Sequence, residues 1–447
     1  MSRSRFNALL GQKGTLRVDR VSRISTLGLN RRSLVKSALA AGGMTVFAGF
    51  GRAPGILAQD NVRLVQWYHQ YGEEGTQDAV MRYAEEFTAA NPNIEVEVVW
   101  QLGDYGAALS AALLTDDGPD VFEQNGVTLD QVRQGQVAPL DDLYTNDLKE
   151  DFGEQNLAPA TIEGSIYWVK MLTDTGGIYY KKSMLADAGA EPPGSIDDVI
   201  AAAQALDTGR VKGLFVGNDG GIGALGGPLL WSAGGSFLTA DNKPGFNTER
   251  VAASWGKLKE LNDTGALLMG STTDYWDPSA FIQGAAAMQW TGLWAFPAIN
   301  EALGEDVGVL AWPPSDADGS PSTFWGGWGS CVNAKSQNID AAKQLVKFLW
   351  IDNTEIQNDW NVGYGFHVTP RRSAASTAEA LQVGAASEMV NNLYEYGVGN
   401  NPLWTPAMGS AYTDALTRVV RDGADAATEL ASLEETVNTE LERLLGS

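Results

Sequence analysis

The side chains best suited to contact a small ligand are aromatic and polar residues at the ends of two short predicted strands. The first strand, predicted over residues 62–67, ends in Trp67 and Tyr68. The second follows a Gly-Pro-Asp turn and ends in Glu123 and Gln124. In open α/β sheets, ligands lie beyond the carboxyl ends of strands, so these four residues are candidates for one wall of a cleft.

A second set of aromatic residues lies beside glycines. Trp231 lies shortly before two glycines, Trp294 follows a predicted glycine turn, and Tyr364 has a glycine on each side. Trp328 lies in a loop rich in glycine and tryptophan, directly after Gly327. Glycine lets backbone N–H and C=O groups approach a ligand with no Cβ in the way. These loops are therefore candidates for contact with a ligand.

The elements that must position these residues are organised around residues 166–193. This stretch predicts a strand, a small polar turn at residues 173–177, a second strand and a short helix. With α/β patterns on both sides of it, the turn is a natural place for the chain to cross between two lobes and to hinge. Asp174 lies in this turn, and Arg372 is a candidate hydrogen-bond donor near the second wall.

Periodicity supports α/β patterns on both sides of this crossing. Residues 62–100 predict a β-α-β unit, in which Asn91-Pro92 ends the helix and apolar residues then alternate with glutamates. The last helix carries one apolar stripe over residues 430–444, which is ordinary packing. The length of 447 residues suits two lobes of ordinary domain size after removal of a leader.

Composition excludes several classes of function. The net charge is −24, but residues 1–58 carry +9, which leaves −33 on the remaining chain. Such a surface argues against nucleic acid or an anionic membrane as partner, because both bind through Lys and Arg. The single Cys331 and the two histidines, His69 and His367, provide no metal-binding motif, so we expect no metal and no cofactor. A GxGxxG match at residues 221–226 lacks the acidic strand of a dinucleotide site.

The N-terminus is predicted to be a targeting segment. Asn30-Arg31-Arg32-Ser33 resembles a twin-arginine export motif, and an apolar run over residues 38–51 follows it. That run is shorter than the roughly 20 residues needed to span a bilayer. We expect a signal peptide over residues 1–58 that is cleaved near Ala58, so that the mature protein is periplasmic or extracellular.

Several motifs together resemble the family 1 extracellular solute-binding proteins, the sugar-binding subunits of ATP-binding-cassette importers. The motifs are FTAANPNIEVEV (Phe87–Val98), GPDVF (Gly118–Phe122), TGGIYYK (Thr175–Lys181), GAAAMQWTGLW (Gly284–Trp294), GGWG (Gly326–Gly329) and the helix Ala341–Leu349. Each motif is weak alone, and their order and spacing carry the resemblance, which covers nearly the whole mature chain.

The resemblance implies an α/β, two-lobed periplasmic-binding-protein fold of type II (the Venus-flytrap fold), with a hinge between discontinuous lobes. We expect residues 59–172 and 306–352 in lobe I, and residues 173–305 and 353–447 in lobe II. It also implies a monomer that binds a sugar or oligosaccharide between the lobes and delivers it to an ABC permease by hinge closure.

Sugar recognition assigns roles to the candidate residues, because pyranose C–H faces stack on aromatic rings and hydroxyls need polar partners. Each aromatic residue is as well explained by core packing as by ligand contact. We assign Trp290 and Trp325 to packing, and Asp120 to orienting its own turn. The candidates for stacking are Trp67, Tyr68, Trp231, Trp294, Trp328 and Tyr364; those for polar contacts are Glu123, Gln124, Asp174 and Arg372; Tyr412 matches a family position that faces sugar.

Two other functions stay open. A secreted carbohydrate-active enzyme, such as a glycosidase or lyase, also uses aromatic residues and carboxylates, although no motif places two acids around one bond. A binding protein of the same kind could instead take a polyol or glycerol phosphate, since Arg371 and Arg372 suit a phosphate.

Overall fold

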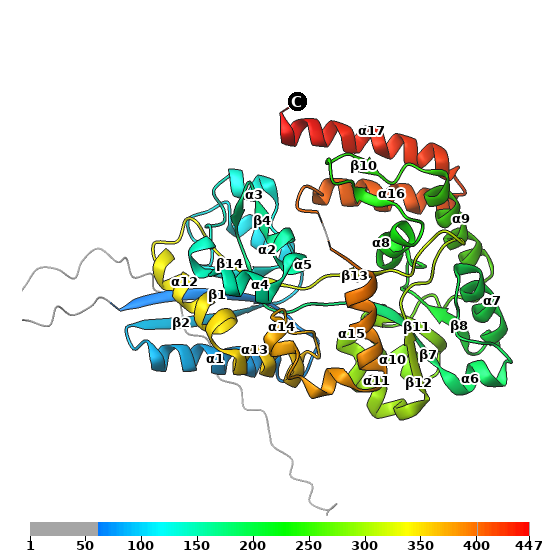
Figure 1. The fold of residues 1–447 in the computed structure, drawn as a ribbon, viewed down its shortest axis with the longest axis horizontal. Helices are drawn as coiled ribbons and strands as arrows, with labels where there is room; N and C mark the ends of the chain where they lie inside the picture. The colour runs from blue at the N-terminus through cyan, green and yellow to red at the C-terminus, as the bar shows by residue number, and fades with distance from the viewer. Residues whose placement is uncertain (1–60, 400, 447) are drawn as a thin grey trace, which may run out of the picture. The chain divides into compact units, whose positions relative to one another are not determined.

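The structure of the protein is a computed structural model, which describes residues 61–399 and 401–446. The predicted signal peptide, its twin-arginine motif and its cleavage near Ala58 lie outside the described residues. Within the described ranges, no helix combines the length and the apolar character needed to cross a bilayer. The fold contains a five-stranded sheet and a four-stranded sheet, each with its own helices (Figure 1).

The first sheet has the strand order β2-β1-β3-β14-β6. Its strands are β1 (Val62–His69), β2 (Ile94–Gln101), β3 (Val121–Gln124), β6 (Val169–Lys170) and β14 (Gly329–Val332). The strand β1 runs parallel to β2 and β3, whereas β14 runs antiparallel to β3 and β6. Parallel pairing of β1 and β2 through a helix confirms the predicted β-α-β unit.

Helices cover this sheet where the sequence is amphipathic. In α1 (Thr76–Ala90) the buried residues include Val80, Tyr83 and Phe87, and the helix ends before Pro92, as predicted. The other helices of this part are α2 (Tyr105–Ala112), α3 (Leu129–Arg133), α4 (Asn146–Phe152), α5 (Glu154–Leu157), α12 (Ile339–Lys347), α13 (Thr354–Asn358) and α14 (Arg372–Ala375). A two-stranded ribbon, β4 (Thr161–Ile162) and β5 (Ser165–Ile166), completes it.

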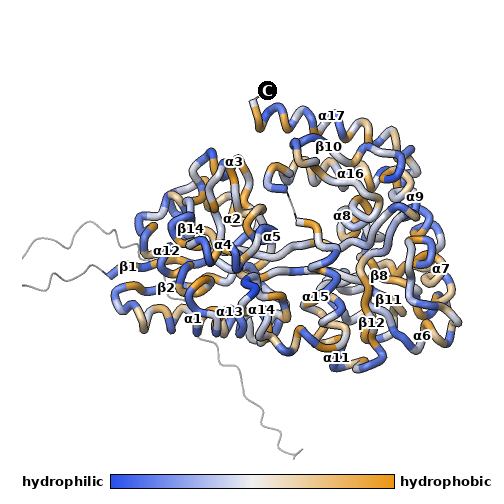
Figure 2. The backbone as a smooth tube through the Cα atoms, viewed as in Figure 1, coloured by the Kyte–Doolittle hydropathy of each residue, from blue (hydrophilic) through white to orange (hydrophobic). Residues whose placement is uncertain are grey.

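The second sheet has the strand order β12-β7-β11-β8. Its strands are β7 (Gly176–Lys181), β8 (Lys212–Phe215), β11 (Ala286–Gly292) and β12 (Val307–Leu310). The central strands β7 and β11 are buried along their whole length, and Figure 2 shows hydrophobic residues along β8 and β11. A sheet covered on both faces buries both sides of its central strands, which explains why burial in β7 and β11 is continuous and does not alternate.

The helices around the second sheet include the long C-terminal pair. They are α6 (Lys182–Asp187), α7 (Ile196–Leu206), α8 (Ile222–Ser232), α9 (Glu249–Asp263), α10 (Ser279–Ile282), α11 (Phe296–Leu303), α15 (Gly384–Tyr396), α16 (Pro406–Asp422) and α17 (Ala426–Leu445). Short strand pairs are β9 (Ser236–Leu238) with β10 (Pro244–Gly245), and β13 (Thr323–Trp325) with β15 (Gly397–Gly399). The predicted apolar stripe of α17 is buried, while hydrophilic residues alternate with it (Figure 2).

Three chain segments run side by side where the chain passes between the two sheets. The segment that joins β6 to β7 hydrogen-bonds on one side to the segment between β13 and β14: Asp174 N donates to Gly326 O at 3.3 Å, and Gly326 N donates to Asp174 O at 2.9 Å. On its other side, Thr173 N donates to Val368 O at 2.9 Å and Val368 N to Thr173 O at 3.0 Å. Residues 173–175 therefore lie at a passage between the sheets, as expected, but the predicted turn is wrong in its second half, because Gly176 and Gly177 already belong to β7.

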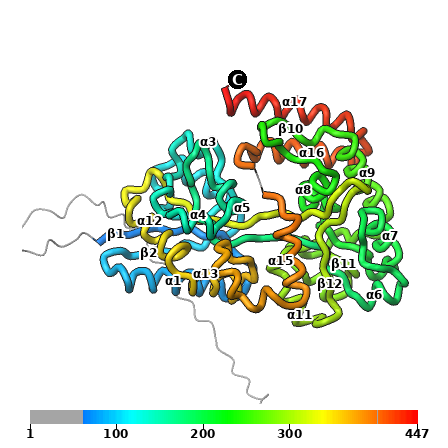
Figure 3. Tube along the Cα trace, viewed as in Figure 1, coloured from blue at the N-terminus to red at the C-terminus, as the bar shows by residue number. Residues whose placement is uncertain are grey.

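Two of the expected lobe boundaries do not match the sheets. Residues 307–310 form β12, which pairs with β7, although we expected residues 306–352 in lobe I. Residues 354–375 were expected in lobe II, but Asp359 accepts hydrogen bonds from Arg82 and Tyr83 of α1. Figure 3 shows α13 beside α1, and α15 beside β12. Strand pairing and helix docking depend on distant segments, so no local signal marks these boundaries.

Candidate functional site

The carboxyl ends of β1 and β3 carry a buried carboxylate network. The side chain of Glu123 is only 1% exposed. Its Oε1 accepts a hydrogen bond from the backbone N–H of His69 at 2.7 Å and lies 2.6 Å from His69 Nδ1, and its Oε2 accepts from the Tyr71 hydroxyl at 2.6 Å. We expected Glu123 to contact a ligand hydroxyl. Instead, both of its oxygens are used within the protein, and the residue holds its neighbours in place.

Tyr68 is also a correction to the predicted site. Its ring is 1% exposed, and its hydroxyl accepts a hydrogen bond from Gln66 Nε2 at 2.8 Å. In β1 the buried side chains alternate with partly exposed ones, so Tyr68 points into the core while Trp67 and His69 share the other face. Trp67 is partly exposed and remains a candidate.

An aromatic stack lies beside this network. Trp328, a predicted stacking residue, is partly exposed, and its ring lies 4.0 Å from the ring of His69, at an angle of 22°. The opposite neighbour of His69 is Tyr71, with ring centroids 3.9 Å apart. Gln124, also predicted, is 7% exposed and exchanges hydrogen bonds with Gln131 of α3. The structure thus gathers three predicted residues, Glu123, Gln124 and Trp328, at one end of the first sheet.

Gly327 has a different role from the predicted one. Its φ is +115°, and a Cβ at this position would lie 2.9 Å from the carbonyl carbon of Leu172, 3.0 Å from Thr173 Cα, and closer still to the carbonyl oxygen of Leu172. The missing side chain therefore lets two crossing segments approach each other. We had expected it to make room for a ligand.

A second group of charges lies at the crossing. Asp174 Oδ1 is 2.5 Å from His367 Nδ1, and Glu73 Oε1 lies 3.7 Å from His367 Nε2. Burial alone lowers the pKa of His367, but the charge and hydrogen bond of Asp174 and the charge of Glu73 outweigh burial and raise the pKa above its ordinary value of 6.5. Burial raises the pKa of Glu73, against the opposing charge of His367. Burial also lowers the pKa of nearby Lys170 to about 7, against the charge of Asp174.

The aromatic candidates around the second sheet separate into exposed and buried ones. Trp231 and Trp294 are partly exposed, and Trp294 Nε1 donates to the backbone oxygen of Trp276 at 2.9 Å. Tyr412 is a correction, because it is 3% exposed and its hydroxyl accepts from Trp255 Nε1 and donates to Gly226 O. It is a core residue between helices.

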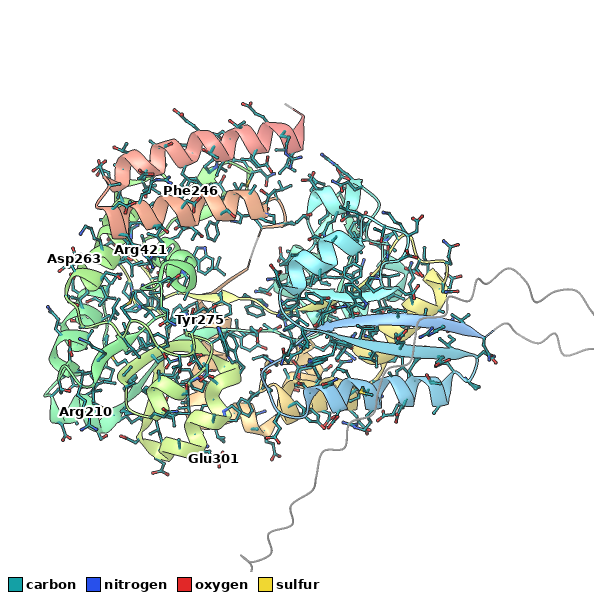
Figure 4. The ribbon with its side chains drawn as sticks, turned by 180° about the vertical axis from the view of Figure 1, so that it is seen from behind. Arg210, Phe246, Asp263, Tyr275, Glu301 and Arg421 are labelled. Carbon is teal, nitrogen blue, oxygen red and sulfur yellow. The ribbon has the colours of Figure 1, made fainter. Side chains whose placement is uncertain are left out.

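The loop that supports Trp294 contains residues that we did not predict. Gln289 Nε2 donates to the backbone oxygens of Tyr275 and Asp277, at 3.0 and 2.9 Å. Burial and the charges of three carboxylates, of which Asp174 at the crossing is one, raise the pKa of Tyr275. Figure 4 labels Tyr275 among the side chains of the second part of the fold.

The remaining predicted residues lie apart from the stack around Trp328. Tyr364 packs against Gly75 at the start of α1, and its hydroxyl accepts from Arg82 at 3.4 Å. The guanidinium of Arg372 lies against Gly153, and its charge acts on Tyr394. Within residues 61–399 and 401–446, neither side chain hydrogen-bonds to the polar network at β1 and β3.

The assignments to packing agree with the structure. Trp290 is 1% exposed and Trp325 is 6% exposed, with Trp325 Nε1 donating to Asn156 Oδ1 at 2.8 Å. Asp120 accepts from the backbone N–H of Val65 at 2.8 Å and orients its turn.

Sequence reasoning missed His69, Tyr71, Glu73 and His367. A signal for His69 was present, because alternation in a strand places residues 67 and 69 on one face. The other three depend on contacts between distant segments. Within the described part of the chain, no group of three or more His, Cys, Asp or Glu side chains is placed to hold a metal ion.

Comparison with known proteins identifies the family. The family model described as bacterial extracellular solute-binding protein matches residues 82–387, which is more than half of the chain. The chain belongs to this family. In this solute-binding protein, the segments between β6 and β7 and between β13 and β14 join the two sheets.

Individual relatives of this solute-binding protein are distant. An uncharacterised ABC transporter extracellular-binding protein of Pyrococcus horikoshii is 25% identical over 334 residues, covering 70% of this chain and 73% of the relative. A maltotriose-binding protein of Pyrococcus abyssi is 25% identical over 312 residues, covering 68% and 66%. The solved receptor of Streptomyces glaucescens, studied unliganded and with acarbose, has a TM-score of 0.74 at 22% identity, covering 87% of this chain and 99% of the receptor.

Proposed function

We propose that this protein is the extracytoplasmic substrate-binding component of an ABC importer, and that it binds a sugar or oligosaccharide between its lobes. The observation that carries the proposal is the stack of Trp328 on His69, which lies beside polar side chains where β1 and β3 end. An aromatic face next to fixed hydrogen-bonding groups is what a pyranose ring requires. Membership of the family and the names of two relatives, which bind maltotriose and diacetylchitobiose, support the same ligand class.

Ligand binding would be coupled to lobe closure at the crossing segments. A ligand that contacts both lobes only in the closed form binds that form more tightly, and so shifts the population toward it. Backbone hydrogen bonds join the segment between β6 and β7 to the segment between β13 and β14, so bending there would move one sheet relative to the other. The permease would then recognise the closed, loaded form. No chemical step is required.

The test is a thermal-shift screen of the mature protein, beginning at Gln59, against maltose, maltotriose, diacetylchitobiose, polyols and glycerol phosphate. A ligand at 100 times its dissociation constant adds about 2.7 kcal/mol to stability. We expect an oligosaccharide to raise the melting temperature and to be recovered unchanged. A shift with glycerol phosphate alone would favour the alternative ligand class.

The second candidate function, a carbohydrate-active enzyme, is tested in the same mixtures. The relatives are named as binding proteins. Chromatography of each sugar after incubation would reveal hydrolysis or elimination, and turnover of any of them would replace the transport proposal with the enzymatic one.

The proposal also covers where the protein acts and its oligomeric state. We propose that the chain acts outside the cytoplasmic membrane as a monomer, without binding nucleic acid, and that the twin-arginine route exports it. Fractionation of cells that lack this route should leave the uncleaved chain in the cytoplasm. Light scattering of the mature protein should give the mass of one chain.

A further inference from the structure

Contacts on several sides fix the position of the His69 side chain. Its ring lies between Trp328 and Tyr71, with centroid distances of 4.0 and 3.9 Å, and Tyr105 meets it edge-on at 5.9 Å. The backbone N–H of His69 is fixed as well, because it donates to Glu123. Three rings and one backbone hydrogen bond therefore define the position of this side chain.

The carboxylate that holds the ring is itself buried. Glu123 is 1% exposed, and burying a carboxylate is costly unless its oxygens are hydrogen-bonded. The donors on His69 and Tyr71 satisfy both oxygens, at 2.6 to 2.7 Å. A buried polar network of this kind specifies one arrangement of its members. Here the member whose orientation it determines is the imidazole ring.

The network leaves one edge of the ring unused. With Nδ1 directed at Glu123, the remaining polar atom is Nε2, and no hydrogen bond to it is found in residues 61–399 and 401–446. The His69 side chain is 19% exposed. The other histidine differs, because His367 Nε2 is a buried atom without a hydrogen bond. Thus Nε2 of His69 is a positioned polar atom on a surface of aromatic rings.

We propose that His69 Nε2 is a direct ligand contact that selects a sugar hydroxyl, and that Glu123 is the positioning residue that fixes its tautomer. This inference rests on the proposed sugar-binding function and names the atom that discriminates among sugars. In the neutral form of the ring, the carboxylate holds the proton on Nδ1, so that Nε2 presents its lone pair as an acceptor. A hydroxyl of a sugar that lies at this exposed edge of the imidazole donates to that lone pair.

The arrangement predicts selectivity as well as affinity. A ligand without the hydroxyl would leave Nε2 desolvated and without a partner in the closed protein, which costs more than the hydrogen bond itself contributes. We expect the deoxy analogue at that position to bind about tenfold or more weakly. The same analogue should lose little against a variant that has no Nε2.

The first test uses nuclear magnetic resonance and does not depend on the ligand. The chain has only two histidines, so ¹⁵N-labelled histidine in the mature protein gives two ring spin systems, and His69→Phe assigns them. Under alkaline conditions, where an ordinary imidazole is neutral, we expect His69 to carry its proton on Nδ1. In Glu123→Gln the Nε2–H tautomer should increase. A wild-type ring with the proton on Nε2 would overturn the proposal.

The second test uses maltotriose and diacetylchitobiose as probes, with thermal shift and calorimetry on the same samples. For the sugar that binds, we expect its addition to move the His69 Nε2 resonance and not that of His367 Nε2. His69→Phe, which keeps a stacking ring, should weaken binding about tenfold or more, whereas His69→Gln should retain part of the affinity. The melting temperature of each variant without sugar separates lost binding from lost folding.

The outcomes distinguish this inference from the proposed function. If a sugar binds while the His69 Nε2 resonance stays in place and His69→Phe binds normally, the contact is wrong and the transport function stands. If neither probe binds, both are rejected for oligosaccharides of these two kinds.

Discussion

The crossing of the chain between the two sheets depends on a position where only glycine fits. Gly327 has φ +115°, a conformation that costs a residue with a Cβ about 1–3 kcal/mol. A Cβ would also overlap the backbone of Leu172 and Thr173, and crowding of this kind in a packed interior costs about 1–3 kcal/mol. We therefore expect Gly327→Ala to lower the free energy of unfolding by about 2–6 kcal/mol.

The expected change in melting temperature follows from chain size. About 390 folded residues give an unfolding entropy of about 0.8 kcal/mol/K, so Gly327→Ala should melt about 3–8 °C lower in calorimetry. Gly265 provides a matched control, because its φ is +71° and a Cβ there meets no atom within 4 Å. Gly265→Ala should cost only the backbone strain, about 1–2 kcal/mol. Equal losses in the two variants would refute the argument from close approach.

Three further predictions concern buried polar groups. Tyr412→Phe removes the acceptor of Trp255 Nε1, so we expect it to lower the free energy of unfolding, measured in urea, by about 1–3 kcal/mol and to leave sugar binding unchanged. A loss of binding at full stability would restore Tyr412 to the site. Burial raises the pKa of the Cys331 thiol well above its ordinary value, so a thiol reagent should modify Cys331 only as fast as the protein unfolds. Rapid labelling of the native protein would contradict this burial. The raised pKa of His367 means that its protonated form favours folding, so its contribution to stability is complete below about pH 6.5 and is lost as pH rises through the higher folded pKa. The difference in unfolding free energy between wild type and His367→Gln, from urea titrations at several pH values, should therefore shrink as pH rises. A difference that does not change with pH would refute the pairing with Asp174.

The candidate site was only partly predictable from the sequence. Glu123, Gln124 and Trp328 could be found because strand ends and glycine-rich loops have local signals. The roles of the three residues could not be found this way. Glu123 is a positioning group because Tyr71 and His69 reach it, and those contacts depend on how the loop after β1 folds back.

For the fold, local patterns determined the type and order of many elements. Hydrophobic periodicity and breakers such as Asn91-Pro92 are properties of neighbouring residues, so they predict the β-α-β unit and the apolar stripe of α17 without tertiary information. Composition likewise determined the acidic character of residues 59–447.

Only the tertiary structure decided which strands share a sheet and which aromatic side chains are exposed. Whether β12 pairs with β7, and whether Tyr68 or Tyr412 faces a ligand or the core, depends on segments that lie far away in the sequence. Aromatic residues are equally suited to cores and to binding surfaces, since both remove apolar area from water. Only the packing of helices and strands around each ring distinguishes the two, and this packing assigned Tyr68 and Tyr412 to the core and left Trp328 beside His69.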